Sequence, residues 1–148
     1  MVDLFIVDFG LKRSVHLSPL LGSYGQTDFE ATITTPLSRE DVIRKLNEAR
    51  EVQRPPDFTG NHLQGTDLRE LDLKQAIMVE ADLSGANLEG ANLSEVDLRR
   101  AKLQGANLKN THLSHATLYK ATYDDFTVWP SDFNPSTNDM VAIHRKKP

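Results

Sequence analysis

Histidines, regularly spaced aspartates and a small group of basic residues are the side chains of this chain that could do chemistry. His112 and His115 form an H-x-x-H pair, which suggests zinc, but no third ligand stands at a fixed spacing from them. The sequence shows no Ser-His-Asp set, no glycine-rich phosphate loop and no HExxH motif. Four aspartates recur at multiples of five residues, too regularly for catalytic pairs: Asp67, Asp72, Asp82 and Asp97. We therefore predict no catalytic residue, no cofactor and no metal site, and a protein that is not an enzyme.

Composition sets further limits on the class of protein. At 148 residues the chain has the length of one domain with at most an arm at each end. It has no cysteine, which excludes a disulfide-stapled scaffold, a thiol enzyme and a cysteine-zinc protein. A formal charge of −4 argues against a general nucleic-acid binder, so we expect no direct nucleic-acid binding.

The N-terminal residues do not have the pattern of a targeting segment. The apolar run from Leu4 to Phe9 contains Asp8, and its basic residues Lys12 and Arg13 follow it instead of preceding it. This order is wrong for a signal peptide, and the run is too short to span a membrane. We expect a cytoplasmic protein with no membrane association.

A five-residue repeat organises the centre of the chain. Residues 56–130 divide into fifteen units, and the middle residue is leucine in eleven of them. The other middle residues are also hydrophobic: Phe58, Met78, Tyr123 and Val128. Alanine stands two residues before the middle position in eight units. A helix would place successive leucines about 140° apart, and one long strand would alternate their faces, so neither fits. Each unit must contain a short extended piece and a bend, with alanine and leucine inside.

The last residue of the unit is suited to the bend. Glycine occupies this position in five units and Asn110 occupies it in a sixth. Both residue types tolerate positive φ, as a type II turn requires. Bends of the same hand, repeated in every unit, close the chain into a coil.

Units such as ADLSG, ANLEG and ANLSE (residues 81–95) resemble the A(D/N)LXX motif of the pentapeptide repeat protein family. The match covers about half of the chain in one register. The resemblance implies an all-β solenoid, a right-handed quadrilateral β-helix in which four units complete one coil. Fifteen units then give just under four coils, a rod roughly 18 Å long. The run YDDFTVWPSDFNP (residues 123–135) resembles the closing segment of many cyanobacterial members, so the chain is similar to short cyanobacterial members of the family.

A few residues depart from the motif. Leu71, Val96 and Phe126 stand where the small inward residue is expected. Ile77 replaces the usual Asp or Asn. We interpret these residues as drift within a tolerant scaffold, with local bulging or a contact with a terminal arm as the alternative.

Both ends of a solenoid require a cover. Ser38 is predicted to be the N-cap of a short capping helix over 38–51, with acidic residues in its first turn. The apolar face of this helix comprises Val42, Ile43, Leu46 and Ala49. At the other end, Phe126, Trp129 and Phe133 are predicted to form an aromatic plug under the last coil.

The chain therefore divides into four segments. Residues 1–37 are an N-terminal arm, irregular or extended, and 38–55 are the capping helix and a linker. Residues 56–130 are the repeat β-helix, and 131–148 are the C-terminal cap and tail.

A coil of twenty residues stacks side chains that are twenty positions apart. The resulting candidate partner-binding patch has two columns: Val79, Arg99 and Tyr119 in one, and Glu80, Arg100 and Lys120 in the other. Three cations beside an aromatic ring make this the most distinctive surface of the coil. The alternative is a solvated face in which Glu80 and Arg100 pair weakly, worth well under ~1 kcal/mol.

Two non-enzymatic functions compete. The first is a protein–protein interaction module or scaffold with an unknown protein partner, either a monomer or a weak end-to-end dimer. The second is implied by the family resemblance: a DNA-mimicking modulator of a type II topoisomerase (DNA gyrase). Residues 56–130 carry 11 acidic and 7 basic residues, and Arg99, Arg100 and Lys120 interrupt any acidic stripe. We favour the interaction module.

Overall fold

The computed structural model describes residues 35–144, and residues 1–34 and 145–148 lie outside the described part. The arm predicted for residues 1–37 is therefore almost wholly outside it, as is the basic end of the tail. All elements below belong to one compact unit that begins at Pro36.

Helix α1 (Arg39–Glu51) begins at the predicted N-cap. Ser38 Oγ accepts a hydrogen bond from the Asp41 N–H (3.2 Å), and the Asp41 carboxylate accepts one from the Ser38 N–H (3.1 Å). This reciprocal capping box satisfies N–H groups that have no partner within the helix. Val42 and Leu46 are buried, whereas Ile43 is exposed and does not belong to the inward face. The apolar face is narrower than predicted because Ile43 directly follows Val42 and therefore lies about 100° away around the helix.

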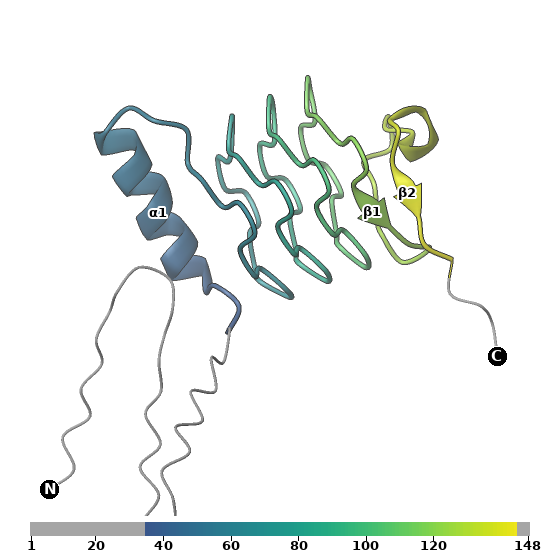
Figure 1. Cartoon of the computed structure of the whole chain (residues 1–148), viewed down its shortest axis with the longest axis horizontal. Helices are drawn as coiled ribbons and strands as arrows, with labels where there is room; N and C mark the ends of the chain where they lie inside the picture. Colours follow the sequence, from purple (N-terminus) through teal and green to yellow (C-terminus); the bar gives the residue numbers. More distant parts are fainter. Residues whose placement is uncertain (1–34, 145–148) are drawn as a thin grey trace, which may run out of the picture. The chain divides into compact units, whose positions relative to one another are not determined.

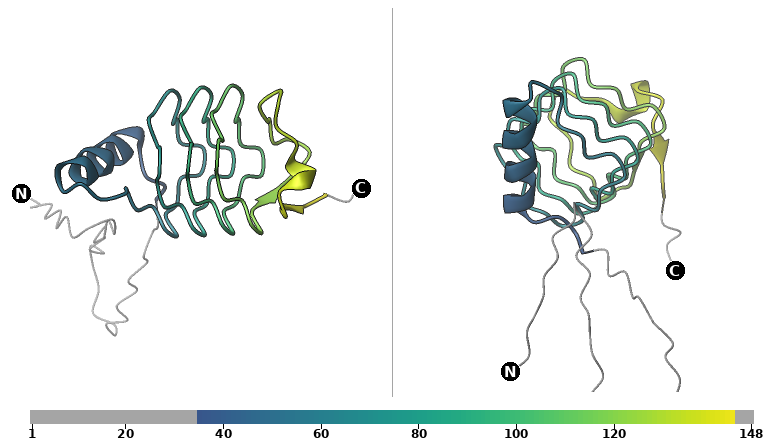
Figure 2. Two further views of the ribbon diagram at one scale, coloured as in Figure 1. Left: turned by 90° about the horizontal axis from the view of Figure 1, so that it is seen from above. Right: turned by 60° about the vertical axis from the view of Figure 1, so that its left-hand side comes forward.

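Helix α1 covers the N-terminal end of the coil (Figures 1 and 2). The Arg39 guanidinium donates to the carbonyl oxygens of Asp67 and Arg69, at 3.0 Å each. The Leu37 N–H donates to the His62 carbonyl (2.7 Å), and Val42 and Leu46 join the hydrophobic core. The first coil thus has both its apolar end and part of its open backbone edge covered.

The repeat segment stacks on itself with a step of twenty residues, as the family resemblance implies. Parallel bridges join residue pairs twenty apart, as in Asp57↔Ile77, Ile77↔Asp97 and Asp97↔Thr117. Four five-residue units therefore complete one coil, and Figure 1 shows the coils stacked side by side to the right of α1. Each side contributes one bridging residue between two-residue turns, so the pairings are mostly isolated bridges. Within residues 35–144 only β1 (Thr122–Tyr123) and β2 (Val141–Ala142) are strands, and they pair in parallel.

The core of the coil consists of the predicted inward residues. The middle leucines from Leu63 to Leu108, together with Phe58 and Met78, are fully buried. Alanines two residues earlier are also buried, since opposite walls approach closely there. Val96 is fully buried in this small-residue position, and Leu71 packs partly buried against the core.

The turns confirm the predicted role of the last residue in each unit. The five glycines there have φ between +64° and +70°, and Asn110 has φ of +58°. The same left-handed conformation is imposed on larger residues in that position: Glu70, Gln75, Glu80, Glu95, Arg100, His115 and Lys120. The fold therefore dictates this conformation at the corner, even though it is strained for a residue with a Cβ.

The register predicted for the last units is wrong by one residue. The Leu108 N–H donates to the Val128 carbonyl, and the Val128 N–H donates to the Ala106 carbonyl, so Asn107 pairs 21 residues ahead with Val128. An extra residue lies between Tyr123 and Val128, where the Gly105 N–H donates to the Asp124 carboxylate (2.9 Å). Thr127 therefore takes the small inward position that was predicted for Phe126.

The aromatic plug is correspondingly different from the prediction. Trp129 stacks on Phe133 (centroids 4.9 Å apart) and meets Tyr123 edge-on (5.6 Å). Phe126, predicted to join this cluster, is 67% exposed because the inserted residue moves it to the outside. Beyond the cluster, a 3₁₀ helix (Pro135–Thr137) leads to β2, which adds the last rung beside β1.

Candidate partner-binding surface

Two columns of side chains on one corner of the coil form the surface that we call the Arg99 patch. It comprises the six residues predicted as a candidate site: Val79, Glu80, Arg99, Arg100, Tyr119 and Lys120. The backbone holds these columns in register, since the Glu80 N–H donates to the Arg99 carbonyl (2.9 Å) and the Arg100 N–H donates to the Tyr119 carbonyl (3.0 Å). The structure therefore brings all six residues together on successive coils.

Arg99 is oriented by the aspartate of its own unit. Its Nε and Nη2 donate to the Asp97 carboxylate at 2.8 and 2.7 Å. This side-chain pairing lowers the pKa of Asp97 below its usual range and raises the pKa of Arg99. A guanidinium carries five N–H donors, so Arg99 keeps others for a further acceptor.

Arg100 pairs with Glu80 across two coils, as the sequence alternative anticipated. Arg100 Nη1 lies 3.0 Å from Glu80 Oε1, with the side chains 64% and 56% exposed. An ion pair this exposed contributes at most about 1 kcal/mol and is readily exchanged.

Lys120 completes the second column beside Tyr119. Its Nζ lies 5.2 Å from the centroid of the Tyr119 ring, and half of Tyr119 is exposed. Within residues 35–144, no carboxylate forms an ion pair with Lys120. The patch therefore offers one cation whose charge is not balanced by an ion pair with this part of the chain.

Lys102 extends the patch onto the next side of the coil and was missed by the sequence reasoning. Its Nζ lies 3.2 Å from Asp82, whose side chain is only 15% exposed while that of Lys102 is 58% exposed. The side chain of Arg99 is likewise more exposed than that of its partner Asp97, at 53% against 26%. In both pairs the cation is more exposed than its carboxylate, so a partner meets Arg99 and Lys102 before Asp97 and Asp82, whereas Glu80 remains exposed beside Arg100. The signal for this residue was available in the run Arg99-Arg100-Ala101-Lys102.

Ile77 adds apolar surface next to the patch. It occupies the outward position of its side and bridges to Asp97, and both Ile77 and Val79 are partly exposed. With Tyr119 they give this corner apolar area beside the cations. The sequence marked Ile77 as a departure from the motif, but only the stacking places it next to Arg99.

The regularly spaced aspartates support turns. Each accepts a hydrogen bond from the N–H two residues later, at 3.1 to 3.3 Å: Asp67 from Arg69, Asp72 from Lys74, Asp82 from Ser84 and Asp97 from Arg99. This is the Asx-turn that replaces a missing backbone partner. The role of these residues is structural.

His112 and His115 are both exposed and lie at different positions of one unit, His112 on a side and His115 at a corner. Among the described residues, no three His, Cys, Asp or Glu side chains are grouped so that they could hold a metal ion.

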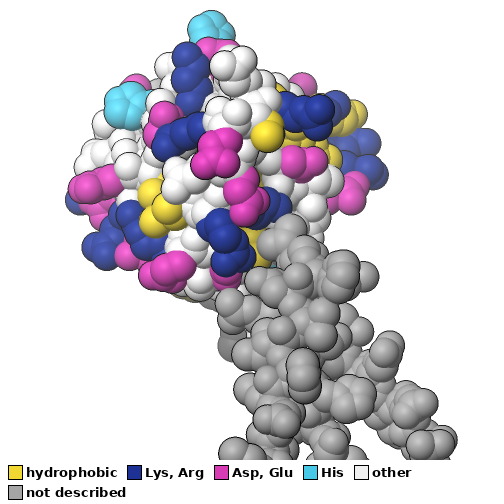
Figure 3. All heavy atoms as spheres, turned by 90° about the vertical axis from the view of Figure 1, so that its left-hand side faces the viewer, with side chains coloured by type: hydrophobic (Ala, Val, Ile, Leu, Met, Phe, Trp, Pro, Cys, Tyr) yellow, Lys and Arg dark blue, Asp and Glu magenta, His cyan; other side chains and the backbone are white. Residues whose placement is uncertain are grey.

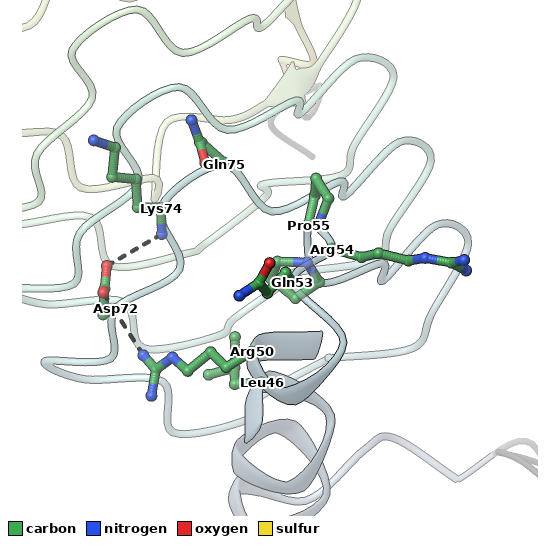
Figure 4. Close-up of a pocket in the computed structure, with 9 residues that line it drawn as sticks. Leu46, Arg50, Gln53, Arg54, Pro55, Asp72, Lys74 and Gln75 are labelled. Carbon is green, nitrogen blue, oxygen red and sulfur yellow. Dashed lines mark hydrogen bonds and ion pairs between the residues drawn. The ribbon is translucent and has the colours of Figure 1, made fainter. Parts of the chain in front are cut away.

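Two further regions of the described residues carry charged side chains. A hollow of about 240 Å³ lies between the end of α1 and the coil, but two of its cations are engaged: Arg50 with Asp72 (3.6 Å) and Lys74 with Glu95 (3.2 Å). Figure 4 shows Arg54 pointing away from Asp72. The end of the unit that carries α1 mixes acidic and basic side chains without a patch of one sign (Figure 3).

Exposed apolar side chains also gather around the last coil, which sequence reasoning did not anticipate. They are Phe126, Val128, Val141 and Ile143, with exposed fractions of 42 to 67%. The one-residue shift of register turns Phe126 and Val128 outward. No helix of the described residues is long and apolar enough to cross a membrane.

Known proteins with the same five-residue repeat are similar to this chain. The family described as pentapeptide repeats (8 copies) matches residues 57–90 and 91–122. A solved pentapeptide repeat protein, alr5209 from Nostoc Pcc 7120, is 30% identical and aligns over 74% of this chain and 99% of its own length, with a TM-score of 0.39. No curated protein matches the chain.

Two other solved cyanobacterial pentapeptide repeat proteins are similar over shorter stretches. Rfr23 from Cyanothece 51142 is 38% identical over 51% of this chain (TM-score 0.44), and the chain spans 55% of its length. HetL from Nostoc sp. strain PCC 7120, involved in heterocyst differentiation regulation, is 32% identical over 40% of this chain (TM-score 0.26) and is spanned over 35% of its length.

The stacked five-residue units define a repeat protein whose distinctive surface is a corner of the coil. With the family matched at residues 57–90 and 91–122 and one relative of 30% identity matched over 99% of its length, the chain belongs to the pentapeptide repeat family.

Proposed function

We propose that this protein is a non-enzymatic protein–protein interaction module or scaffold that binds a protein partner at the Arg99 patch. In this proposal the coil is a right-handed, four-sided β-helix over residues 56–130. Residues 38–55 and 131–148 cap it, residues 1–37 are an arm, and the protein acts in the cytoplasm as a monomer or a weak end-to-end dimer. A rigid solenoid suits this role because it presents side chains at fixed spacing along its length.

The observation that carries the proposal is the combination of cations and apolar area at one corner. Arg and aromatic side chains are enriched at protein interfaces, and partly exposed apolar groups supply area that is buried on binding. Arg99, Arg100 and Tyr119 lie together beside Ile77 and Val79. On the rest of the repeat the acidic residues outnumber the basic ones.

No observation favours the alternative, a DNA-mimicking modulator of a type II topoisomerase. A DNA mimic requires a continuous acidic surface in place of the phosphates. At the Arg99 patch exposed cations interrupt any such surface, because Arg99 and Lys102 are more exposed than their partners Asp97 and Asp82.

The experiment that tests the proposal is affinity capture from a lysate of cells in which the protein occurs. The baits are the native chain, a patch variant (R99E/R100E/K120E) and a control variant (R69E/K74E/K109E). The control makes the same change of charge and also removes cations that pair with carboxylates, since Arg69, Lys74 and Lys109 pair with Asp67, Glu95 and Glu89.

We expect a protein that is retained by the native chain and the control but lost by the patch variant. Equal retention by both variants, or retention by none of the baits, contradicts the proposal. Thermal unfolding of the three baits checks that the coil is intact in each.

A further inference from the structure

The Arg99 patch combines positive charges with apolar area. Provided that the proposed function holds, this combination limits the kind of protein segment that can bind there. Three residues of the patch are cations, Arg99, Arg100 and Lys120, and Lys102 follows Arg100 two residues later on the same coil. The patch thus differs from the remainder of the repeat, where acidic side chains are in excess.

The carboxylates that pair with these cations leave them able to bind another anion. Asp97 engages one edge of the Arg99 guanidinium, through Nε and Nη2, and leaves the remaining N–H donors. Glu80 binds only Nη1 of Arg100. Lys120 contacts the face of Tyr119 and forms no ion pair with the described residues. Each group can therefore donate to a carboxylate brought by a partner without losing the contacts that orient it.

Apolar area lies next to these donors on the same corner. Ile77 and Val79 are two residues apart on the coil that precedes Arg99, and Tyr119 is half exposed on the coil that follows it. An apolar side chain that covers Ile77 and Val79 keeps water from the neighbouring ion pairs, which strengthens them.

We infer that the partner binds the Arg99 patch through an acidic segment that also carries an apolar side chain. Its carboxylates meet Arg99, Arg100 and Lys120, and the apolar side chain covers Ile77 and Val79. Charge complementarity selects this occupant, because Arg99, Arg100 and Lys102 each pair with one carboxylate while Lys120 pairs with none among the described residues, and an acidic segment supplies the counter-charge that Lys120 lacks.

Selection from a random peptide library displayed on phage tests this inference with the full chain as target. The native chain, R99E/R100E/K120E and the control R69E/K74E/K109E are used in parallel. Enriched peptides are synthesised, and their affinities are measured by fluorescence anisotropy at low salt and at about 1 M salt, where the Debye length is about 3 Å.

We expect the native chain and the control to enrich peptides that are rich in Asp and Glu and contain at least one apolar residue. Their affinity is expected to fall by about tenfold or more in the patch variant, as for charge pairs at an interface, and to fall also at high salt. The variant I77N separates the apolar contribution, because it weakens binding while leaving the cations in place.

Three outcomes overturn the inference: enriched peptides without acidic bias, acidic peptides that bind the patch variant equally well, or no enrichment with any target. Its failure is distinguishable from failure of the proposed function. If lysate capture depends on the patch while selected peptides have no acidic bias, the interaction module stands and only the acidic partner is wrong.

Discussion

Ile77 and Asp97 occupy the same outward position on consecutive coils and pair through a parallel bridge, yet only Asp97 closes its turn. The Asp97 carboxylate accepts the Arg99 N–H at 3.2 Å, whereas the Ile77 side chain has no acceptor for the N–H of Val79. The unit at Ile77 therefore gives up a turn hydrogen bond and gains outward apolar area. The apolar area gained at Ile77 lies next to the cations of the Arg99 patch, where the proposed partner binds.

The first prediction is that Ile77→Asn separates stability from binding. Asparagine restores the acceptor for the Val79 N–H but removes partly buried apolar area, so the free energy of unfolding is expected to change by less than about 1 kcal/mol. Partner capture is expected to weaken. Urea unfolding and the lysate capture measure the two effects. Unchanged capture contradicts a role for Ile77 in binding.

The second prediction concerns the corner glycines. Gly85 has φ of +67°, and an added Cβ would meet nothing within 4 Å, so the cost of Gly85→Ala is conformational alone. We expect a loss of about 1 kcal/mol in urea unfolding, because alanine disfavours the left-handed region. Gly85→Asn, which tolerates that region better, is the control and is expected to lose less. A cost for alanine no greater than that for asparagine would show that the corner is not strained.

The third prediction compares two leucines in the same position of the unit. Leu88 is fully buried in the middle of the coil, whereas Leu113 is only partly buried near its end. Leu88→Ala is expected to cost about 2–5 kcal/mol through lost burial and a cavity, and Leu113→Ala less. Thermal and urea unfolding of both variants measure the difference. Equal losses would mean that the core is not continuous as described.

The fourth prediction tests the one-residue shift at the end of the coil. Phe126 is 67% exposed, so Phe126→Ser is expected to change the free energy of unfolding by no more than about 0.5 kcal/mol. Trp129 stacks on Phe133 and packs against the core, so Trp129→Ala is expected to cost about 3 kcal/mol. The reverse order would restore the unbroken register, in which Phe126 points inward.

The fifth prediction is a dependence of stability on pH through Asp97. The hydrogen bonds from Arg99 lower the pKa of the Asp97 carboxyl in the folded protein below its value in the unfolded chain. The contribution of Asp97 is therefore complete above the unfolded pKa, about 3.9. It is lost as the pH falls below that value and through the folded pKa.

Asp97→Asn provides the comparison for this prediction. The difference in free energy of unfolding between the native chain and the variant is expected to shrink as the pH is lowered from neutral through about 3.9. Urea unfolding at several pH values measures it. A difference that stays constant with pH would show that Asp97 is not stabilised in its charged form.

Much of the fold could be predicted because the residues that determine the conformation of each five-residue unit lie within that unit. Leucine in the middle position and glycine at the corner predict the inward and turning residues, and Ser38 with Asp41 predicts the start of α1. The last units could not be predicted from the repeat. The inserted residue near Asp124 is detectable only through its partners, since the Asp124 carboxylate replaces a backbone acceptor for Gly105.

For the candidate surface, too, the sequence predicted some features and the structure alone revealed others. The sequence by itself determined the five-residue period and the inward residues, because burial of leucine and positive φ at the corner are decided within each unit. With the twenty-residue step of the family it also placed Arg99 beside Arg100 and Tyr119. Only the tertiary structure decided that Asp82 on one coil pairs with Lys102 on the next and that Phe126 faces outward. Those features depend on pairing between coils and on side-chain exposure, and both are determined by residues that lie far apart in the chain.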